Sequence, residues 1–191
     1  PGRLAFYTTA DGANSPTERM RLDSGGRMLM GATSSSGNFR AVFEGNAGNA
    51  AAGGDILLCR GSTTPANGQN LGLVGFGDDT QTVSAQVQAF RNAGTWSSSS
   101  KPTALRFSTA PNSSNSVIER ARITADGNYL IGTTEQFSAA SSTATGHRIE
   151  PSGVVSHYRN SGTIMYIGRQ GNDGTLVNFL QAGGSEGSIA V

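Results

Sequence analysis

The stretch "ERMRLDSGGRMLMGATS", Glu18–Ser34, is nearly repeated later in the chain. The stretch "ERARITADGNYLIGTTE", Glu119–Glu135, aligns with it without a gap at an offset of 101 residues. When the alignment is extended back to Leu4 and Leu105, twelve positions are identical. A third copy of the turn alone, "RIEPSGVV", lies at Arg148–Val155. One supersecondary unit, used more than once, therefore organises the chain.

The repeated unit has the pattern of β-structure. Apolar residues occupy alternate positions at the start of residues 4–8, and Glu18, Met20 and Leu22 alternate with two arginines. This is the period of a strand with one buried face. The turns "DSGG", "TADGN" and "EPSG" place glycine where a tight hairpin needs a positive φ angle. Helical periodicity is hard to find, so the sequence predicts an all-β fold of short strands and hairpins.

The composition predicts a thin core for a single chain. Only 36 of the 191 residues are Leu, Ile, Val or Phe, a share low enough to raise the question of disorder. Disorder normally also needs a high net charge, and here the net charge is +1. Many short strands also leave open sheet edges that must be covered. We therefore expect an elongated, repeat-containing fibrous fold that completes its core against copies of itself.

Several classes of partner and site have no support in the sequence. The basic residues are scattered, so no basic stripe indicates nucleic-acid binding. Cys59 is the single cysteine, which excludes an internal disulfide and a cysteine-based zinc site. The longest apolar runs are a few residues, so we expect no membrane insertion. Residue 1 falls just before the first repeat, and we expect the chain to be part of something longer.

The repeats divide the chain into four expected segments. The first hairpin module is 1–35 and the second is 103–135, with a β-rich spacer at 36–102 between them. Region 136–191 begins with a connector, "SAASSTATG", and continues as short strands. Further strands are predicted in "GDILLCRG" (54–61), "NLGLVGFGDD" (70–79) and "GTIMYIGR" (162–169).

Few residues have a pattern that indicates chemistry. Asp78 and Asp79 are adjacent carboxylates, but consecutive strand residues point to opposite faces, which suits a glycosidase pair poorly. They are either a polar turn or part of a binding loop. Trp96 is the single tryptophan and either packs locally or stacks on a sugar ring. His147 and His157 are ten residues apart and have no recognised metal spacing, so we expect surface residues.

The arginines of the repeat have two interpretations. Arg19 and Arg21 bind an acidic glycan, or they form a ladder that pairs with Glu or Asp on neighbouring strands. The same pair recurs as Arg120 and Arg122, which favours the ladder.

The repeated modules resemble a known family. "SPTERMRLDSGGRMLMGATS" and "ALRFSTAPNSSNSVIERARITADGNYLIGTT" resemble the recurrent module of bacteriophage tail fibres and related appendage proteins, and "GTWSSSSKPTALRF" resembles the spacer between such modules. "RQGNDGTLVNFLQAGGSEGSIAV" resembles the segment just upstream of an endosialidase-type intramolecular chaperone, which is itself absent from the chain. In that family the chaperone assembles three chains and then cleaves itself off at a serine. By this resemblance Val191 is either the end left by that cleavage or an arbitrary boundary.

The resemblance implies an intertwined homotrimer in the phage virion. Its partners would be copies of itself, other phage tail proteins and a host surface glycan or other receptor. We expect receptor contacts from Trp96, Asp78 and Asp79, no catalytic residue, no metal and no cofactor. Two alternatives stay open: a tailspike-type glycan-degrading domain with a site between subunits, and a bacterial trimeric surface adhesin.

Overall fold

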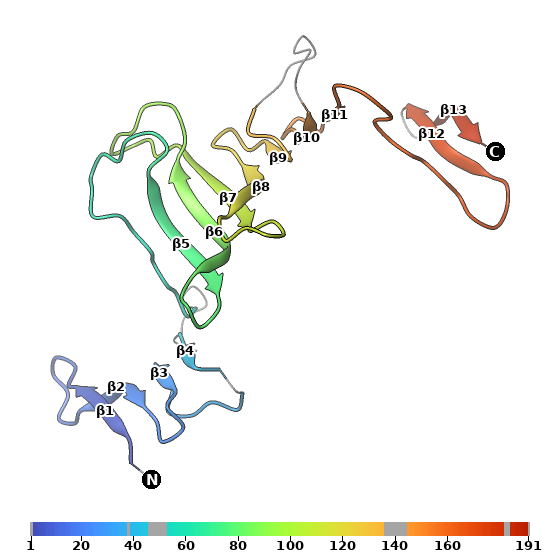
Figure 1. The fold of residues 1–191 in the computed structure, drawn as a ribbon. Helices are drawn as coiled ribbons and strands as arrows, with labels where there is room; N and C mark the ends of the chain where they lie inside the picture. The colour runs from blue at the N-terminus through green and yellow to red at the C-terminus, as the bar shows by residue number, and fades with distance from the viewer. Residues whose placement is uncertain (1, 38, 46–52, 136–144, 182–183, 191) are drawn as a thin grey trace. The chain divides into compact units, whose positions relative to one another are not determined.

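The computed structural model describes residues 2–37, 39–45, 53–135, 145–181 and 184–190. Within these residues all regular secondary structure is β-strand, so the fold is all-β, as predicted (Figure 1). Among the same residues no helix is long and apolar enough to cross a bilayer. The strands are β1 (Leu4–Thr8), β2 (Thr17–Leu22), β3 (Met28–Met30), β4 (Ala41–Phe43), β5 (Asn70–Gly77), β6 (Val83–Arg91), β7 (Thr103–Thr109), β8 (Ile118–Ile123), β9 (Tyr129–Ile131), β10 (Gly146–Ile149), β11 (Val155–Tyr158), β12 (Thr175–Gln181) and β13 (Gly184–Ala190).

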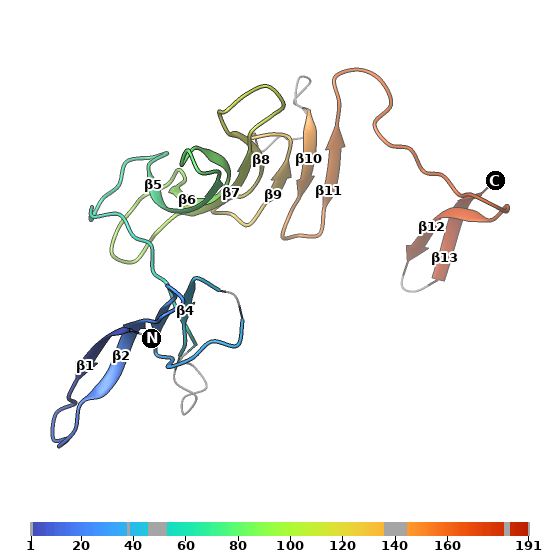
Figure 2. The same ribbon diagram turned by 60° about the horizontal axis from the view of Figure 1, so that its bottom comes forward.

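The chain divides into two compact units, Pro1–Leu58 and Cys59–Val191. The first unit holds a sheet of order β1-β2-β3-β4, in which β4 pairs parallel to β3 and the other pairs are antiparallel. The second holds an antiparallel sheet of order β11-β10-β9-β8-β7-β6-β5, whose later strands lie side by side in Figure 2. The hairpin β12–β13 forms a further two-stranded sheet.

The two sequence repeats have the same strand register. In β1–β2, Leu4 pairs with Leu22 and Phe6 pairs with Met20. In β7–β8 the residues at the offset of 101 pair in the same way, and the register shifts at the equivalent place in both hairpins. β3 and β9 then pair equivalently with β2 and β8. The local sequence of the repeat thus specifies one hairpin geometry twice.

The three glycine turns share one backbone geometry. Gly26, Gly127 and Gly153 have φ angles of 71°, 80° and 88°, and each N–H donates to the carbonyl three residues earlier at 2.9 to 3.0 Å. A side chain would be strained in this left-handed conformation, which explains why glycine occupies the same place in all three turns.

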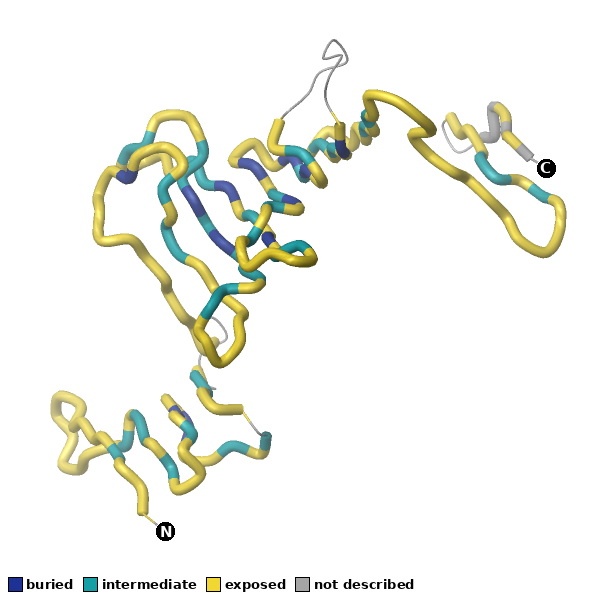
Figure 3. The backbone as a smooth tube through the Cα atoms, viewed as in Figure 1, coloured by how far each residue is buried: buried dark blue, intermediate teal, exposed yellow. Residues whose placement is uncertain are grey.

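The buried core is small. Leu29 in β3 and Leu130 in β9, which are equivalent in the repeats, have no exposed surface. Most other buried residues of the second unit lie on β6–β9 and in the turn between β8 and β9 (Figure 3), whereas Pro65 lies before β5 and Gly146 lies in β10. Most large apolar side chains that the structure describes are at least one-third exposed. One chain therefore leaves much of its apolar surface in water.

The structure differs from the sequence-based expectation in the spacer and the tail. Within the predicted spacer, residues 36–102, β4 joins the first sheet whereas β5 and β6 join the second. Neither "GDILLCRG" nor "GTIMYIGR" forms a strand, and Leu57 and Tyr166 are 85 % and 87 % exposed. Neither segment pairs with a strand in the part of the chain that the structure describes. Val191 and most of the expected connector lie outside the described residues.

Candidate functional site: the exposed face of the repeated hairpins

A β-bulge sorts the side chains of each repeated hairpin onto two faces. The extra residue is Arg19 in β2 and Arg120 in β8, and neither has a partner in the register. Residues three apart on a regular strand point to opposite faces, but the extra residue reverses this relation. Glu18 therefore lies on the side of Arg21, and the prediction that it shares a face with the apolar residues of β2 is wrong.

Glutamate and arginine form a bidentate pair on this side of both hairpins. Arg21 donates from Nε and Nη2 to the two carboxylate oxygens of Glu18, and Arg122 does the same to Glu119. The hydrogen bond from Arg21 lowers the pKa of Glu18 and in turn raises that of Arg21. Both bidentate pairs lie within one strand, and Glu119 also forms an ion pair with Arg106 of the neighbouring strand β7, at 3.9 Å. The recurring arginines are thus held by the hairpin itself.

The polar face of the first hairpin is closed by the chain that follows it. Arg21 Nη1 donates to the carbonyl of Thr33 at 2.6 Å, and Arg27 Nη1 donates to that of Ser35 at 3.1 Å. These bonds hold the loop against the strands, and Leu29, the partner of Arg21 in β3, is fully buried.

On the polar face of the second hairpin, side chains of β6 cover the arginines. The guanidinium groups of Arg106 and Arg122 lie 4.9 Å and 5.3 Å from the ring centre of Phe90. Arg106 also donates to the side-chain oxygen of Gln88. Phe90 is only 6 % exposed, so this face has an internal core of its own.

The opposite face of each hairpin is apolar and open, and we call it the apolar face. Its large residues are between 36 % and 58 % exposed. In the two repeats they are Leu4, Phe6, Leu22 and Met30, and Leu105, Phe107, Ile123 and Ile131. The same positions in the two repeats therefore share strand register, and all of them are at least one-third exposed.

In the second sheet the apolar face continues beyond the repeat. Leu105, Ile123, Tyr129, Ile149 and Val155 are successive partners across five strands. Single exposed apolar residues are ordinary, whereas a contiguous row of them marks a surface that another molecule covers. This row is a candidate contact surface of the unit.

Asp78 and Asp79, predicted as receptor contacts, lie in the turn between β5 and β6. Asp78 accepts hydrogen bonds from the hydroxyl and backbone N–H of Thr80, at 2.6 Å and 3.1 Å. These bonds, chiefly the one from the hydroxyl, lower the pKa of Asp78. The carboxylate of Asp78 therefore caps its own turn.

Trp96, the third predicted contact, lies in the loop between β6 and β7. Its Nε1–H donates to the carbonyl of Thr63 at 3.1 Å, and Lys101 Nζ lies 4.9 Å from its ring centre. The two loops are at opposite ends of β6, whose nine residues span about 27 Å. One chain therefore does not bring Trp96 together with Asp78 and Asp79.

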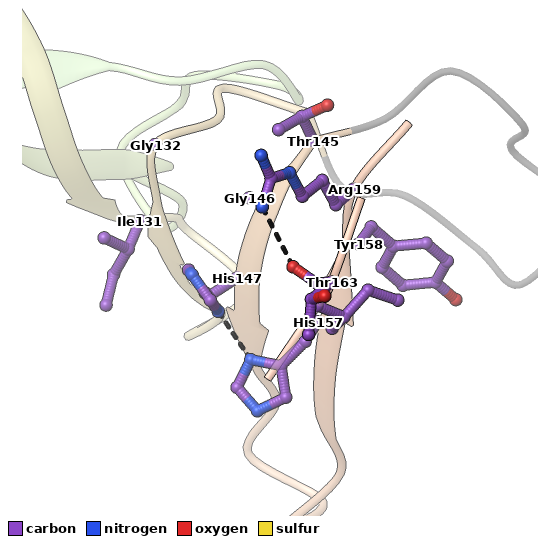
Figure 4. Close-up of a pocket in the computed structure, with 10 residues that line it drawn as sticks. Ile131, Gly132, Thr145, Gly146, His147, His157, Tyr158, Arg159 and Thr163 are labelled. Atoms are coloured by element: carbon purple, nitrogen blue, oxygen red, sulfur yellow. Dashed lines mark hydrogen bonds between the residues drawn. The ribbon is translucent and has the colours of Figure 1, made fainter. Parts of the chain in front are cut away.

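The structure brings together two residues that sequence spacing kept apart. His147 and His157 are direct partners in β10–β11, and they line a cavity of about 410 Å³ (Figure 4). The signal was present in the third turn, because the two residues are equally distant from Ser152 within it. The spacing of ten residues along the chain did not indicate this histidine pair. Pairing the two strands of the hairpin about its turn would have predicted it.

Comparisons with known proteins give little further guidance. No family model matches the chain, and no curated protein matches it. Among solved structures, the chain is similar to the carboxy-terminal domain of the bacteriophage T5 L-shaped tail fibre. The two are 18 % identical with a TM-score of 0.38, over 84 % of this chain and 73 % of that one. This score is too low to support an argument about function.

Proposed function

We propose that this chain is a structural and host-adhesion segment of a phage tail fibre, in which three copies wind around one another. The observation that carries the proposal is the apolar face, which is open at equivalent positions in both hairpins while the opposite face is closed internally. Because the same face is exposed in both hairpins, its exposure is best explained by a role in the repeating architecture.

The energetics favour covering this face with other copies. Fully burying a Leu, Ile or Phe side chain contributes roughly 1.5 to 3 kcal/mol, and each copy presents such residues in rows. The small internal core supplies little of this burial by itself. The number three rests on the resemblance of the repeat to tail-fibre modules.

Adhesion is assigned to the loops rather than to the hairpins. The hairpin modules must pack identically in every copy, whereas connecting loops are free to vary and often carry recognition. The Asp78–Asp79 turn and the Trp96 loop would each occur three times, so that weak contacts with a host glycan or other receptor add up. Because the two loops lie at opposite ends of β6, they would act as separate contact points.

The assembly is tested by the mass in solution. Light scattering coupled to gel filtration should give three times the chain mass of 19.6 kDa. A well-folded monomer at micromolar concentration would overturn the proposal.

The adhesion is tested by competitive binding to host cells. Trp96→Ala should reduce adsorption while Arg19→Ala, in the hairpin, leaves it unchanged, provided that both variants keep the wild-type mass. Trp96→Phe keeps the ring but not the bond to Thr63, and so distinguishes stacking on a receptor from positioning of the loop. Full adsorption by a trimeric Trp96→Ala variant would remove this residue from the site.

We propose no catalysis in this chain. The carboxylate of Asp78 is occupied by Thr80, and incubation with host polysaccharide should release no oligosaccharide. Release that Asp78→Asn or Asp79→Asn abolished would replace the adhesion proposal with the glycan-degrading alternative.

A further inference from the structure

The two histidines of the chain face each other because of the hairpin that contains them. Glu150 N–H donates to the carbonyl of Val154 at 2.9 Å, which defines a hydrogen-bonded pair next to the turn. Such pairs alternate with non-hydrogen-bonded pairs along an antiparallel ladder, and side chains approach most closely in the latter. Counting outwards, His147 and His157 form a non-hydrogen-bonded pair.

The rings meet through nitrogen atoms. The Nδ1 atoms of His147 and His157 are 2.5 Å apart, and the ring centres are 4.8 Å apart at an angle of 73°. A neutral imidazole has one protonated and one bare nitrogen, so this contact needs a single proton between two nitrogens that both point inwards. Two nitrogen lone pairs directed at one point are also the donor arrangement of a metal ligand pair.

We propose that His147 and His157 together bind a late first-row divalent cation such as Zn²⁺, Ni²⁺ or Cu²⁺. Imidazole nitrogen suits these ions, whereas Mg²⁺ and Ca²⁺ require oxygen ligands. In a tetrahedral site with metal–nitrogen bonds of 2.0 to 2.1 Å, two ligand nitrogens lie roughly 3.3 Å apart. The rings therefore need to separate by less than about 1 Å, with each proton held on Nε2.

The surroundings have room for the ion and its remaining ligands. The histidines line the cavity of about 410 Å³ between strands β9 to β11 and the segment after β11 (Figure 4). Its cationic side chain, Arg159, donates from Nη1 to the carbonyl of Thr163, which also lines the cavity, at 2.9 Å. The described residues offer no group of three or more His, Cys, Asp or Glu side chains for a metal, so water completes the coordination.

The bound ion would fasten the edge of the sheet. β11 is the last strand of the seven-stranded sheet and pairs only with β10 there. A cation held by one ligand from each strand crosslinks them, and any ligand that binds only the folded state raises its stability. This inference does not depend on the number of chains, so it can fail or succeed independently of the proposed fibre.

The experiment is a calorimetric titration of the full, untagged chain with Zn²⁺ alone. His147→Ala and His157→Ala should each weaken binding by at least about tenfold, because loss of even an outer-shell partner often costs that much. The matched control is Cys59→Ser, which removes the one exposed thiol and should leave the affinity unchanged. Mg²⁺ should give no binding signal.

A second measurement on the wild-type chain guards against variants that do not fold. Zn²⁺ should shift the nitrogen resonances of both histidine rings, with the larger change at Nδ1, and should raise the unfolding temperature reversibly on chelation. Unshifted histidine resonances at saturating Zn²⁺, or affinity lost in Cys59→Ser and retained in both histidine variants, would overturn the proposal.

Discussion

The hairpins β1–β2–β3 and β7–β8–β9 have the same register, the same bulge and the same glutamate–arginine pair, yet their neighbours differ. β3 is followed by β4, which pairs with it in parallel, whereas β9 is followed by β10, which pairs antiparallel. On the other side, β1 ends its sheet and β7 pairs with β6. The hairpin is thus a fixed unit that accepts different surroundings.

The surroundings change how far the apolar face is exposed. Leu4 is 58 % exposed and its counterpart Leu105 is 36 % exposed, while Phe6 and Phe107 are 48 % and 37 % exposed. The lower values belong to β7, which has strands on both sides. Repeat sequence therefore determines which residues face outwards, and neighbouring strands determine how much of each is covered.

The largest expected effect comes from a charge on the apolar face. Phe6→Asp and Phe107→Asp should both prevent assembly, because the lost burial and the unpaired carboxylate recur in every copy. Phe107→Asp should also lower the stability of the single chain, since β6 and β8 flank this residue.

The measurement for these variants is the mass in solution, with circular dichroism as the check on folding. Ser84→Asp is the matched control, because it places the same charge at an exposed position of β6. If both phenylalanine variants kept the wild-type mass, the apolar face would not be the contact between copies.

An intermediate effect is expected where the two repeats meet different neighbours. Gly31 and Gly132 are equivalent and have φ angles of 78° and 68°, so alanine is strained at either position by about 1 to 2 kcal/mol. A Cβ at Gly31 would also lie 2.2 Å from the carbonyl oxygen of Glu44, whereas at Gly132 it meets no atom within 4 Å. Gly31→Ala should therefore be the more destabilising, as measured by urea unfolding. Equal losses would argue against the parallel pairing of β4.

The sequence predicted the parts of the fold whose information is local. The alternation in β1 and β2 and the glycines of the three turns were sufficient for the hairpins and their return strands. The bulge could not be predicted from this alternation. The alternating pattern assigns Glu18 and Met20 to the same face, which holds only if no extra residue is inserted between them. Its signal was the spacing of Glu18 and Arg21, since an ion pair three residues apart does not fit a regular strand.

Non-local pairing accounts for the rest. Nothing in the short strand β4 indicates that it pairs in parallel, and the apolar segment around Leu57 has no strand partner among the described residues. The same limit applied to the candidate sites. Trp96 and Asp78 are close in sequence but separated by the length of β6, whereas His147 and His157 are brought together by a turn.

The smallest expected effect concerns the turns, where the repeats use different acceptors for equivalent bonds. In the first turn the carboxylate of Asp23 accepts from the N–H of Arg27 at 3.0 Å, and in the second the hydroxyl of Thr124 accepts from that of Asn128 at 3.2 Å. The backbone bond from Arg27, followed by that from its side chain, lowers the pKa of Asp23. A carboxylate with a lowered folded-state pKa stabilises the fold above its unfolded pKa, and this stability is lost as the pH falls through the folded value. A hydroxyl does not ionise in this range.

Acidification from pH 7 to about pH 3 should therefore reduce the hydrogen-exchange protection of the Arg27 amide more than that of the Asn128 amide. Asp23→Thr, which copies the second turn into the first, should remove part of this difference. Part of the difference in protection should remain, because the pKa of Glu18 in the first hairpin is also lowered, chiefly by the hydrogen bond from the Arg21 side chain. Protection of each amide is read after correction for intrinsic exchange at each pH, so that only the local opening is compared. Equal losses of protection at both amides in the wild-type chain would mean that the turns do not differ in their acceptor. If the difference between the two amides were unchanged in Asp23→Thr, the acid sensitivity would be assigned to Glu18 alone.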